Sequence, residues 1–306
     1  MTTPFKIFGG TSHPALVKNV CQVLGLTQAA SFTKVFSNEN LLVRIDEDVR
    51  GCDCFVIQTA SPPLHTNMME LFMFCHTLRS CGAKSICAVM PYFPYIRSDK
   101  QDKPGVGIIA RLVADLVETS GATRAILLDL HSRQAQGFFK MPTCVVSAAD
   151  ILTQYLKTLD LSQAVLVAPD AGEVKDLVPY TEMLSLPMAI IDKRRQDDNE
   201  QAKAYGIVGD IEGKTAILID DEIATGTTIC ESAAILKARG AAQIIALCTH
   251  PVFSGNAIEQ LEKAPIEHII VTDSLPLRTH APKLTQLSIA PVLAQAILAH
   301  FPPKTE

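Results

Sequence analysis

The chain has 306 residues, of which 48% are hydrophobic and 19% charged, a composition typical of a globular protein with two domains of ordinary size. Its formal net charge of -5 disfavours a nucleic-acid binder that relies on attraction to phosphates, and no basic stripe contradicts this. The N-terminus lacks a targeting pattern and no apolar run approaches the roughly 20 residues of a membrane helix, so we expect a cytoplasmic protein that contacts neither nucleic acid nor membrane.

Short apolar strands alternate with amphipathic helices along the chain. The pattern predicts strands over residues 54–58, 85–92, 124–130, 164–168, 188–192, 215–220, 243–249 and 268–272. It predicts helices over residues 67–80, 108–120, 172–179, 228–238, 256–263 and 289–301. This alternation indicates an α/β protein with parallel sheets covered by helices on both faces.

Two of the predicted strands resemble each other in sequence. Residues 123–131 read Thr-Arg-Ala-Ile-Leu-Leu-Asp-Leu-His, and residues 214–221 read Lys-Thr-Ala-Ile-Leu-Ile-Asp-Asp. Ligands of open α/β sheets bind outside the carboxyl ends of strands, so we expect a duplicated domain with two such edges. We place the domains at residues 1–147 and 148–306, and the last helix either packs back on the N-terminal domain or contacts another subunit.

The segment 217–228 predicts a binding site for a ribose phosphate. An apolar strand ends in Asp220 and Asp221, which can hold ribose hydroxyls or a hydrated cation. The hydroxyl-rich loop 225–228 then offers O–H and backbone N–H groups to a phosphate, at the positive end of the next helix. The alternative is an ordinary connection whose acidic residues cap a helix, and this segment alone leaves both interpretations open.

Further segments complete a pattern that spans the chain from Lys6 to about Ile289. They are Arg50-Gly51-Cys52-Asp53, Met69-Glu70-Leu71, residues 90–103 (Met-Pro-Tyr-Phe-Pro-Tyr-Ile-Arg-Ser-Asp-Lys-Gln-Asp-Lys), residues 127–139 (Leu-Leu-Asp-Leu-His-Ser-Arg-Gln-Ala-Gln-Gly-Phe-Phe), Pro169-Asp170-Ala171-Gly172 and Asp192-Lys193-Arg194-Arg195. Together with the 220–228 loop, they closely resemble the ribose-phosphate diphosphokinase family.

The resemblance implies a fold, an assembly and a reaction. The expected fold is two similar type I phosphoribosyltransferase-like domains, each a mostly parallel sheet flanked by helices, and the expected assembly is a homo-oligomer, a hexamer built from dimers. The reaction moves the diphosphoryl group of MgATP to the 1-hydroxyl of ribose 5-phosphate, giving 5-phosphoribosyl 1-diphosphate and AMP. The N-terminal domain is expected to hold the nucleotide and the subunit contacts, and the C-terminal domain the ribose-phosphate loop.

The resemblance also implies roles for individual residues. Lys193 and Arg195 lie in a charged segment without apolar periodicity, which we expect to be a mobile loop that brings both cations to the transferring phosphates. His131 and Asp170 are implied to contact the Mg²⁺ cofactor. The remaining implied ligands are Phe36, Asn38, Arg97, Asp102 and Lys103 for ATP, and Asp220, Asp221, Thr225, Gly226, Thr227 and Thr228 for ribose 5-phosphate. Phe36 and Asn38 are implied to reach the adenine of a neighbouring subunit.

Several positions depart from the family pattern. In the ribose-phosphate loop, Ala224 replaces an Asp and Thr227 a Gly, so one carboxylate near the sugar is missing. In the nucleotide segments, Asn40 replaces a Glu and Ser98 a Gln. Glu173 replaces a Gly and places a carboxylate near an anionic substrate. These differences leave the donor and acceptor preferences open.

Three alternatives stay open beside the diphosphokinase. A catalytically silent regulatory homologue usually loses the cations of the charged segment, whereas Lys193 and Arg195 are retained here. A diphosphokinase with another acceptor that contains ribose 5-phosphate is supported only by Ala224 and Thr227. A phosphoribosyltransferase that consumes the diphosphate explains the 220–228 loop and leaves the first domain unexplained.

The nine cysteines form no metal-ligand pattern. They are an odd number, lie in apolar segments and are never spaced as paired ligands. We expect them to be reduced core residues.

Activation by inorganic phosphate is expected to be weak or absent. Phosphate-activated members of the family have a Ser-Arg pair where this chain has Pro104-Gly105, so an Arg that could bind phosphate with two hydrogen bonds is missing. At saturating MgATP, adding phosphate should change the initial rate of AMP release by less than about twofold, compared with chloride at the same ionic strength. A severalfold stimulation would contradict this prediction.

Overall fold

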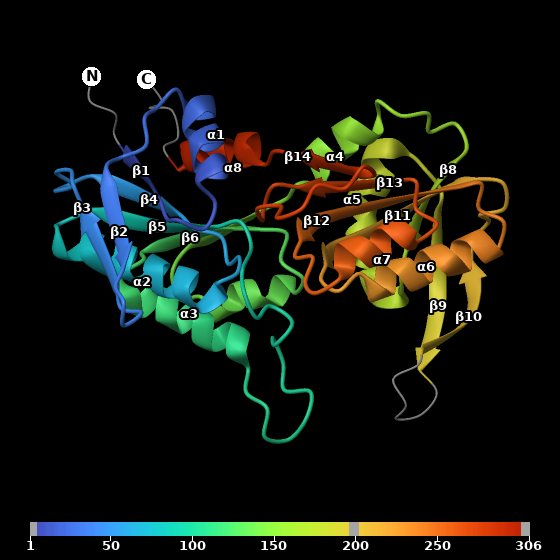
Figure 1. The fold of residues 1–306 in the computed structure, drawn as a ribbon, viewed down its shortest axis with the longest axis horizontal. Coiled ribbons are helices and arrows are strands. Elements are labelled where there is room, and N and C mark those ends of the chain that lie inside the picture. The colour runs from blue at the N-terminus through green and yellow to red at the C-terminus, as the bar shows by residue number, and fades with distance from the viewer. Residues whose placement is uncertain (1–4, 196–201, 301–306) are drawn as a thin grey trace. The chain divides into compact units, whose positions relative to one another are not determined.

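The computed structural model describes residues 5–195 and 202–300, with the side chains of residues 193–195 and 202–205 outside the description. The chain forms two compact units (Figure 1). Unit 1 comprises residues 1–147, 274–276 and 288–306, and unit 2 comprises residues 148–273 and 277–287. Each unit is built around one sheet.

Unit 1 contains a parallel sheet with helices on both faces. Its strands lie in the order β1 (Phe5–Gly9), β4 (Asp53–Ile57), β5 (Ser85–Met90), β6 (Arg124–Leu128) and β7 (Thr143–Val146). The helices are α1 (Pro14–Leu24), α2 (Leu64–Ser80), α3 (Ile109–Ser120), the 3₁₀ helix η1 (Arg133–Phe138) and α8 (Ala290–Ala299). Helices α1 and α8 cover one face and α2 and α3 the other (Figure 1). An antiparallel hairpin, β2 (Ser31–Val35) and β3 (Leu41–Ile45), follows α1.

Unit 2 contains a larger sheet in which one pair of the described strands is antiparallel and the others are parallel. The strand order is β10 (Ala202–Val208), β9 (Met188–Arg195), β8 (Ala164–Ala168), β11 (Thr215–Ile223), β12 (Gln243–Pro251), β13 (His268–Thr272) and β14 (Leu284–Leu287), with β9 and β10 antiparallel. The helices are α4 (Ala149–Leu156), η2 (Ala171–Glu173), α5 (Val174–Leu184), α6 (Thr227–Ala238) and α7 (Ala257–Lys263). The predicted fold class, two mostly parallel sheets with flanking helices, is therefore confirmed.

The two units share one connectivity, which supports the predicted duplication. In each unit, the first strand (β1 or β8) is followed by a helix, a hairpin, and four strands that pair side by side in chain order. The equivalent strands are thus β4 and β11, whereas the sequence comparison matched β6 with β11. That match was wrong because any buried parallel strand reads as an apolar run, so burial rather than position produced the similarity.

Helices α4 and α8 each pack in a different unit from the strand that precedes them in the chain. Helix α4 follows β7 in the chain but packs against α5 in unit 2, and α8 follows β14 but packs against α1 in unit 1. Apolar side chains of α8, including Leu293 and Ile297, are fully buried. Burying a side chain of this size contributes about 1.5–3 kcal/mol, so each exchanged helix contributes to the core of its unit.

The predicted helices and strands were all confirmed in type, but several boundaries differ. Helix α5 was expected to end at Pro179 and instead runs to Leu184, with Pro179 inside it. Leu177 and Tyr180 are buried on this helix, so packing maintains it past a residue that removes one backbone hydrogen bond. Helix α1 was missed; it begins with Pro14 after His13, whose Nδ1 accepts a hydrogen bond from Leu16 N at 3.3 Å.

Other elements escaped the sequence analysis because their patterns are short or exposed. These are β1, β2, β3, β7, α4, β10 and β14. In the hairpin β2–β3, Val35 and Phe32 are exposed while backbone pairing holds the strands, so the apolar pattern carries little information.

The cysteines divide into buried and exposed groups. Five are buried (Cys21, Cys54, Cys75, Cys87 and Cys248), two are intermediate (Cys52 and Cys230), and two are exposed (Cys81 and Cys144). All are free thiols, so the expected reduced state agrees with the structure. The prediction that all are core residues is wrong for Cys81 and Cys144, which lie in a turn and in a strand with a mixed burial pattern.

In the described residues, no helix is long and apolar enough to cross a membrane.

Thiol reactivity should separate these groups. Burial raises the pKa of Cys75 to about 12, and burial is also the main cause that raises the pKa of Cys54 to about 12. The thiolate is the reactive form of cysteine. When native protein is treated with a disulfide reagent, Cys81 and Cys144 should therefore react in a fast kinetic phase, and the buried thiols should react only in denaturant. The double variant Cys81→Ser/Cys144→Ser should lack the fast phase, and its persistence would contradict the assignment.

Candidate active site

The candidate site of unit 2 lies where β8 and β11 pair. Their parallel register runs from Ala164↔Thr215 to Val167↔Leu218, after which β11 continues beside β12 alone as far as Ile223. From β8 the chain passes to β9 on one side and later returns to β11 on the other. The loops that follow β8 and β11 therefore leave the sheet at a switch point of strand order, where open α/β sheets bind ligands.

Strand β11 carries the predicted acidic pair at its carboxyl end. The strand was expected to end at Asp220 and instead continues through Asp221 and Glu222 to Ile223. Asp221 is 8% exposed and Asp220 is half-buried. The pairing with β12 (Asp220↔Cys248 and Glu222↔His250) fixes the backbone here, so the acidic side chains project from a strand rather than from a loop.

The loop after β11 presents hydroxyl groups at the start of α6. Thr225, Thr227 and Thr228 are exposed, and Thr225 Oγ1 and Thr227 Oγ1 are 3.1 Å apart. Gly226 precedes the helix with φ of 82°, a left-handed conformation that glycine adopts without a steric penalty. The positive end of a helix and exposed hydroxyls together suit an anion such as a phosphate.

The loop after β8 is organised by Asp170. Its Oδ1 accepts hydrogen bonds from Gly172 N at 2.7 Å and Glu173 N at 3.3 Å, capping η2. Helix α5 follows at Val174. Asp170, one of the predicted metal ligands, is thereby held in a fixed orientation at the carboxyl end of β8.

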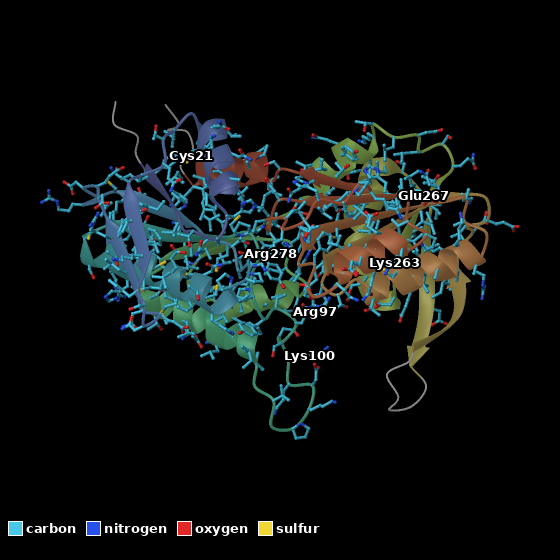
Figure 2. The ribbon with its side chains drawn as sticks, in the orientation of Figure 1. Cys21, Arg97, Lys100, Lys263, Glu267 and Arg278 are labelled. Carbon is cyan, nitrogen blue, oxygen red and sulfur yellow. The ribbon has the colours of Figure 1, made fainter. Side chains whose placement is uncertain are left out.

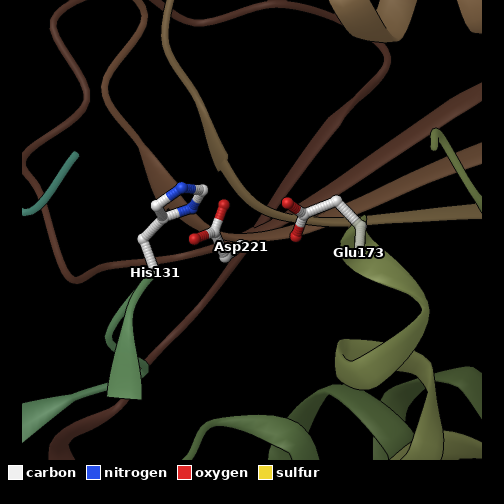
Figure 3. Close-up of side chains that lie close together, drawn as sticks. All are labelled: His131, Glu173 and Asp221. Carbon is white, nitrogen blue, oxygen red and sulfur yellow. The ribbon is translucent and has the colours of Figure 1, made fainter. Parts of the chain in front are cut away.

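Glu173 and Asp221 meet at this edge of unit 2. Their carboxylate oxygens lie within 4.8 Å of each other, and Figure 3 shows the two side chains projecting from different elements. Like charges at this separation repel, and a shared divalent cation would relieve the repulsion, because carboxylate oxygens are ligands that Mg²⁺ prefers. The sequence identified Glu173 only as a departure from a pattern; nothing local signals its proximity to Asp221, which the pairing of β8 with β11 creates.

His131, also labelled in Figure 3, belongs to unit 1 and follows β6. Asp129 has a φ of 34°, a strained value for a residue other than glycine, and lies between the strand and His131. His131 is half-buried just before η1. A strained turn thus sets where this predicted metal ligand leaves the sheet of unit 1.

Phe36 and Asn38 lie in the turn of the β2–β3 hairpin. Phe36 is 41% exposed, with Lys34 Nζ 5.2 Å from its ring centroid. Asn38 Oδ1 accepts a hydrogen bond from Asn40 N at 3.2 Å, and Phe36 N donates to Asn40 O. The turn is therefore held by its own hydrogen bonds and presents an exposed aromatic ring.

Arg97, Asp102 and Lys103 all lie on the exposed connection between β5 and α3. Figure 2 labels Arg97 on this long loop of unit 1. The three residues are exposed. Near the start of the loop, Phe93 is buried and Tyr95 has a positive φ of 58°. The structure therefore keeps these three predicted nucleotide ligands on one accessible segment.

The backbone of Lys193 and Arg195 lies in strand β9, so the expectation of a loop at these residues is wrong. Lys193 pairs with Ala204 and Arg195 with Ala202 of β10, and the two strands form a ribbon at the edge of the sheet (Figure 1). Backbone hydrogen bonds hold such a ribbon without an apolar face, so the charged sequence did not reveal the strand. The side chains of Lys193 and Arg195 lie outside the described residues, as do residues 196–201.

Comparison with known proteins identifies the family. The profile of the N-terminal domain of ribose phosphate pyrophosphokinase matches residues 5–121, and that of the phosphoribosyl synthetase-associated domain matches residues 201–302. A ribose-phosphate pyrophosphokinase of Helicobacter hepaticus is 41% identical over 293 residues, covering 96% of this chain and 94% of the relative. The chain belongs to the ribose-phosphate pyrophosphokinase family.

Other ribose-phosphate pyrophosphokinases match over the same extent. The Bacillus subtilis protein is 42% identical over 295 residues, covering 96% of this chain and 93% of its own. The crystal structure of phosphoribosylpyrophosphate synthetase from Mycobacterium smegmatis superposes with a TM-score of 0.92 at 38% identity, covering 98% of this chain and 99% of that one. Since pyrophosphokinase and diphosphokinase name the same activity, the family resemblance seen in the sequence is confirmed.

The pair Glu173 and Asp221 generates a prediction about divalent cations. Glu173→Gln removes one charge and one possible cation ligand and keeps the shape of the side chain. If the two carboxylates share a cation, adding MgCl₂ should raise the unfolding temperature of the wild type, and the variant should lose roughly half of that rise or more.

The matched control for this measurement is Glu182→Gln. Glu182 is exposed near the end of the same helix, α5, and its substitution makes the same change in net charge. Its response to MgCl₂ should equal that of the wild type. An equal response of Glu173→Gln would show that Glu173 takes no part in cation binding.

Proposed function

We propose that this protein is a ribose-phosphate diphosphokinase, which transfers the diphosphoryl group of MgATP to the 1-hydroxyl of ribose 5-phosphate and releases 5-phosphoribosyl 1-diphosphate and AMP. The observation that carries the proposal is the family match, which extends over 96% of the chain and includes both units. The strand end of β11 and the threonine loop before α6 support it, because they offer the chemistry that a ribose phosphate needs.

Ribose 5-phosphate is assigned to the carboxyl end of β11. Asp220 and Asp221 would accept hydrogen bonds from ribose hydroxyls, and their acidic groups are held by the pairing of β11 with β12. The phosphate would lie against residues 225–228, where Thr225, Thr227 and Thr228 are exposed and α6 begins. Gly226 lets the backbone turn toward the phosphate at a positive φ.

The cofactor Mg²⁺ is assigned to His131 and Asp170 by the family resemblance. The donor types fit a divalent cation that keeps most of its ligands as water and phosphate oxygens. When bound, Mg²⁺ would neutralise charge on the phosphates. Asp170 is positioned for this role because Gly172 N and Glu173 N hold its Oδ1, and we assign the other oxygen, Oδ2, to the ion.

Lys193 and Arg195 are assigned to the phosphoryl groups in transfer. Diphosphoryl transfer needs positioning and positive charge more than covalent chemistry from the protein. The β9–β10 pairing supports the assignment by giving the backbone of both residues a defined strand geometry. Losing one such donor typically costs about 3 kcal/mol in the barrier, which is about a hundredfold in rate.

Unit 1 is assigned to the nucleotide and to subunit contacts. Arg97, Asp102 and Lys103 would bind ATP from the β5–α3 connection, and Phe36 and Asn38 would reach the adenine of a neighbouring subunit. A homo-oligomer, a hexamer built from dimers, is part of this proposal. Exposed apolar residues at helical spacing along and just before α3, Ile108 (40%), Leu112 (51%) and Leu116 (42%), support a subunit contact there.

A coupled assay that follows AMP release from MgATP and ribose 5-phosphate tests the proposal. Lys193→Ala should lower the rate by at least about tenfold, because a donor to the transition state is lost. Lys157→Ala is the matched control: Lys157 is an exposed lysine that ends α4, and its substitution makes the same charge change and should leave the rate unaltered.

Each remaining outcome rejects part of the proposal. Absence of AMP from ribose 5-phosphate, with or without inorganic phosphate, would reject this acceptor. Ala224 and Thr227 then favour an acceptor with a bulkier group on ribose 5-phosphate, which the same assay detects. Equal rates for Lys193→Ala and the wild type would reject the assignment of Lys193 to the phosphoryl groups in transfer.

A further inference from the structure

Unit 1 contains a buried carboxylate that lies outside the proposed reaction site. Glu70 on α2 is 1% exposed. Its Oε2 accepts three hydrogen bonds: from Thr11 N at 3.0 Å, Thr11 Oγ1 at 2.7 Å and Gln58 Nε2 at 2.7 Å. Three donors that converge on one oxygen form a cradle for an anion.

No positive charge accompanies this carboxylate. Among the described side chains, none forms an ion pair with Glu70, and no donor reaches its second oxygen, Oε1. Burying a carboxylate without a cation is unfavourable, and the neighbouring positions of α2, Leu71 and Phe74, are apolar and fully buried. The three hydrogen bonds to Oε2 therefore have to offset this cost, and an apolar residue at position 70 would leave Thr11 and Gln58 without their acceptor.

Gln58 and the loop after β1 complete the cradle. Gln58 is 1% exposed; its Oε1 accepts hydrogen bonds from Ser12 N at 3.2 Å and Ser12 Oγ at 2.6 Å. A Cβ at Gly10 would lie 2.1 Å from Gln58 Oε1, so the loop reaches this position only with glycine there. Thr11 and Ser12 thus direct both their N–H and O–H groups toward Gln58 and Glu70.

The cradle lies at the edge of unit 1 that corresponds to the candidate site of unit 2. The loop of Thr11 and Ser12 follows β1, which is equivalent to β8. Gln58 follows β4 directly, and β4 is equivalent to β11. In unit 2, Gly172 N and Glu173 N donate to Asp170 of their own loop. In unit 1, the N–H groups of Thr11 and Ser12 donate instead to Glu70 on α2 and to Gln58, which follows β4.

We propose that the Glu70 carboxyl group fills an oxyanion-binding cradle of unit 1, formed by Thr11 and Gln58, and that this cradle binds a small carboxylate when the Glu70 side chain is removed. The inference rests on the geometry of unit 1 and does not depend on the proposed reaction.

Chemical rescue of Glu70→Ala tests this inference. The substitution removes Cγ, Cδ and both carboxylate oxygens, a set with the heavy-atom composition of acetate. In sodium chloride, the variant should unfold at least about 5 °C below the wild type. In sodium acetate of equal ionic strength, it should recover roughly half of that loss or more, while the wild type should not change.

Glu118→Ala is the matched control. Glu118 Oε1 also accepts two backbone N–H groups, those of Lys140 and Met141, but this carboxylate is only partly buried. Water can replace it, so acetate should stabilise Glu118→Ala no more than the wild type. An acetate effect of equal size in both variants, or none in Glu70→Ala, would overturn the proposal.

Glu70→Gln keeps the test decisive if Glu70→Ala does not fold. The amide fills the same volume without the charge, so the variant should be less stable than the wild type and insensitive to acetate, because the cradle stays filled. A Glu70→Gln protein as stable as the wild type would show that the cradle does not require an anion.

Discussion

The parallel pairing of β8 with β11 is the constraint on which the candidate site depends. The register from Ala164↔Thr215 to Val167↔Leu218 brings the carboxyl ends of the two strands to one edge. Asp170 and Glu173 then come from one side of the switch point, and Asp221 and the threonine loop from the other. Parallel strands need a long crossover between them, so residues that are distant in the sequence become neighbours at this edge.

Duplication of one architecture has produced two different edges. In unit 2, the strand ends carry acids and exposed hydroxyl groups. In unit 1, Gln58 and Glu70 take up the N–H groups of the first loop, and the exposed polar residues lie instead on the hairpin turn and the β5–α3 connection. The same backbone connectivity therefore supports a filled edge and an accessible one, and the side chains at a few strand ends make the difference.

Like charges and strained backbone occur at or near the assigned residues of both units. Glu173 and Asp221 place two carboxylates within 4.8 Å of each other. In unit 1, Asp129 and Tyr95 have positive φ values close to His131 and Arg97, which we assign to Mg²⁺ and ATP. Unfavourable charge contacts and strained backbone are tolerated where the surrounding structure holds them, and they concentrate at functional sites. The buried strands of each sheet, such as the fully apolar β8, supply that support.

The sequence by itself determined the fold class, the type of every predicted element and the family, because strand and helix periods and the order of motifs are local properties of the chain. It also identified Asp220, Asp221 and the threonines as a group, since they are contiguous. It did not reveal the strand at Lys193 and Arg195, the equivalence of β4 with β11, or the helix that continues through Pro179. Only the tertiary structure decided these, and it alone brought Glu173 to Asp221 and Glu70 to Thr11. Strand order and packing between distant segments set those contacts, and neither is encoded in the local pattern of residues.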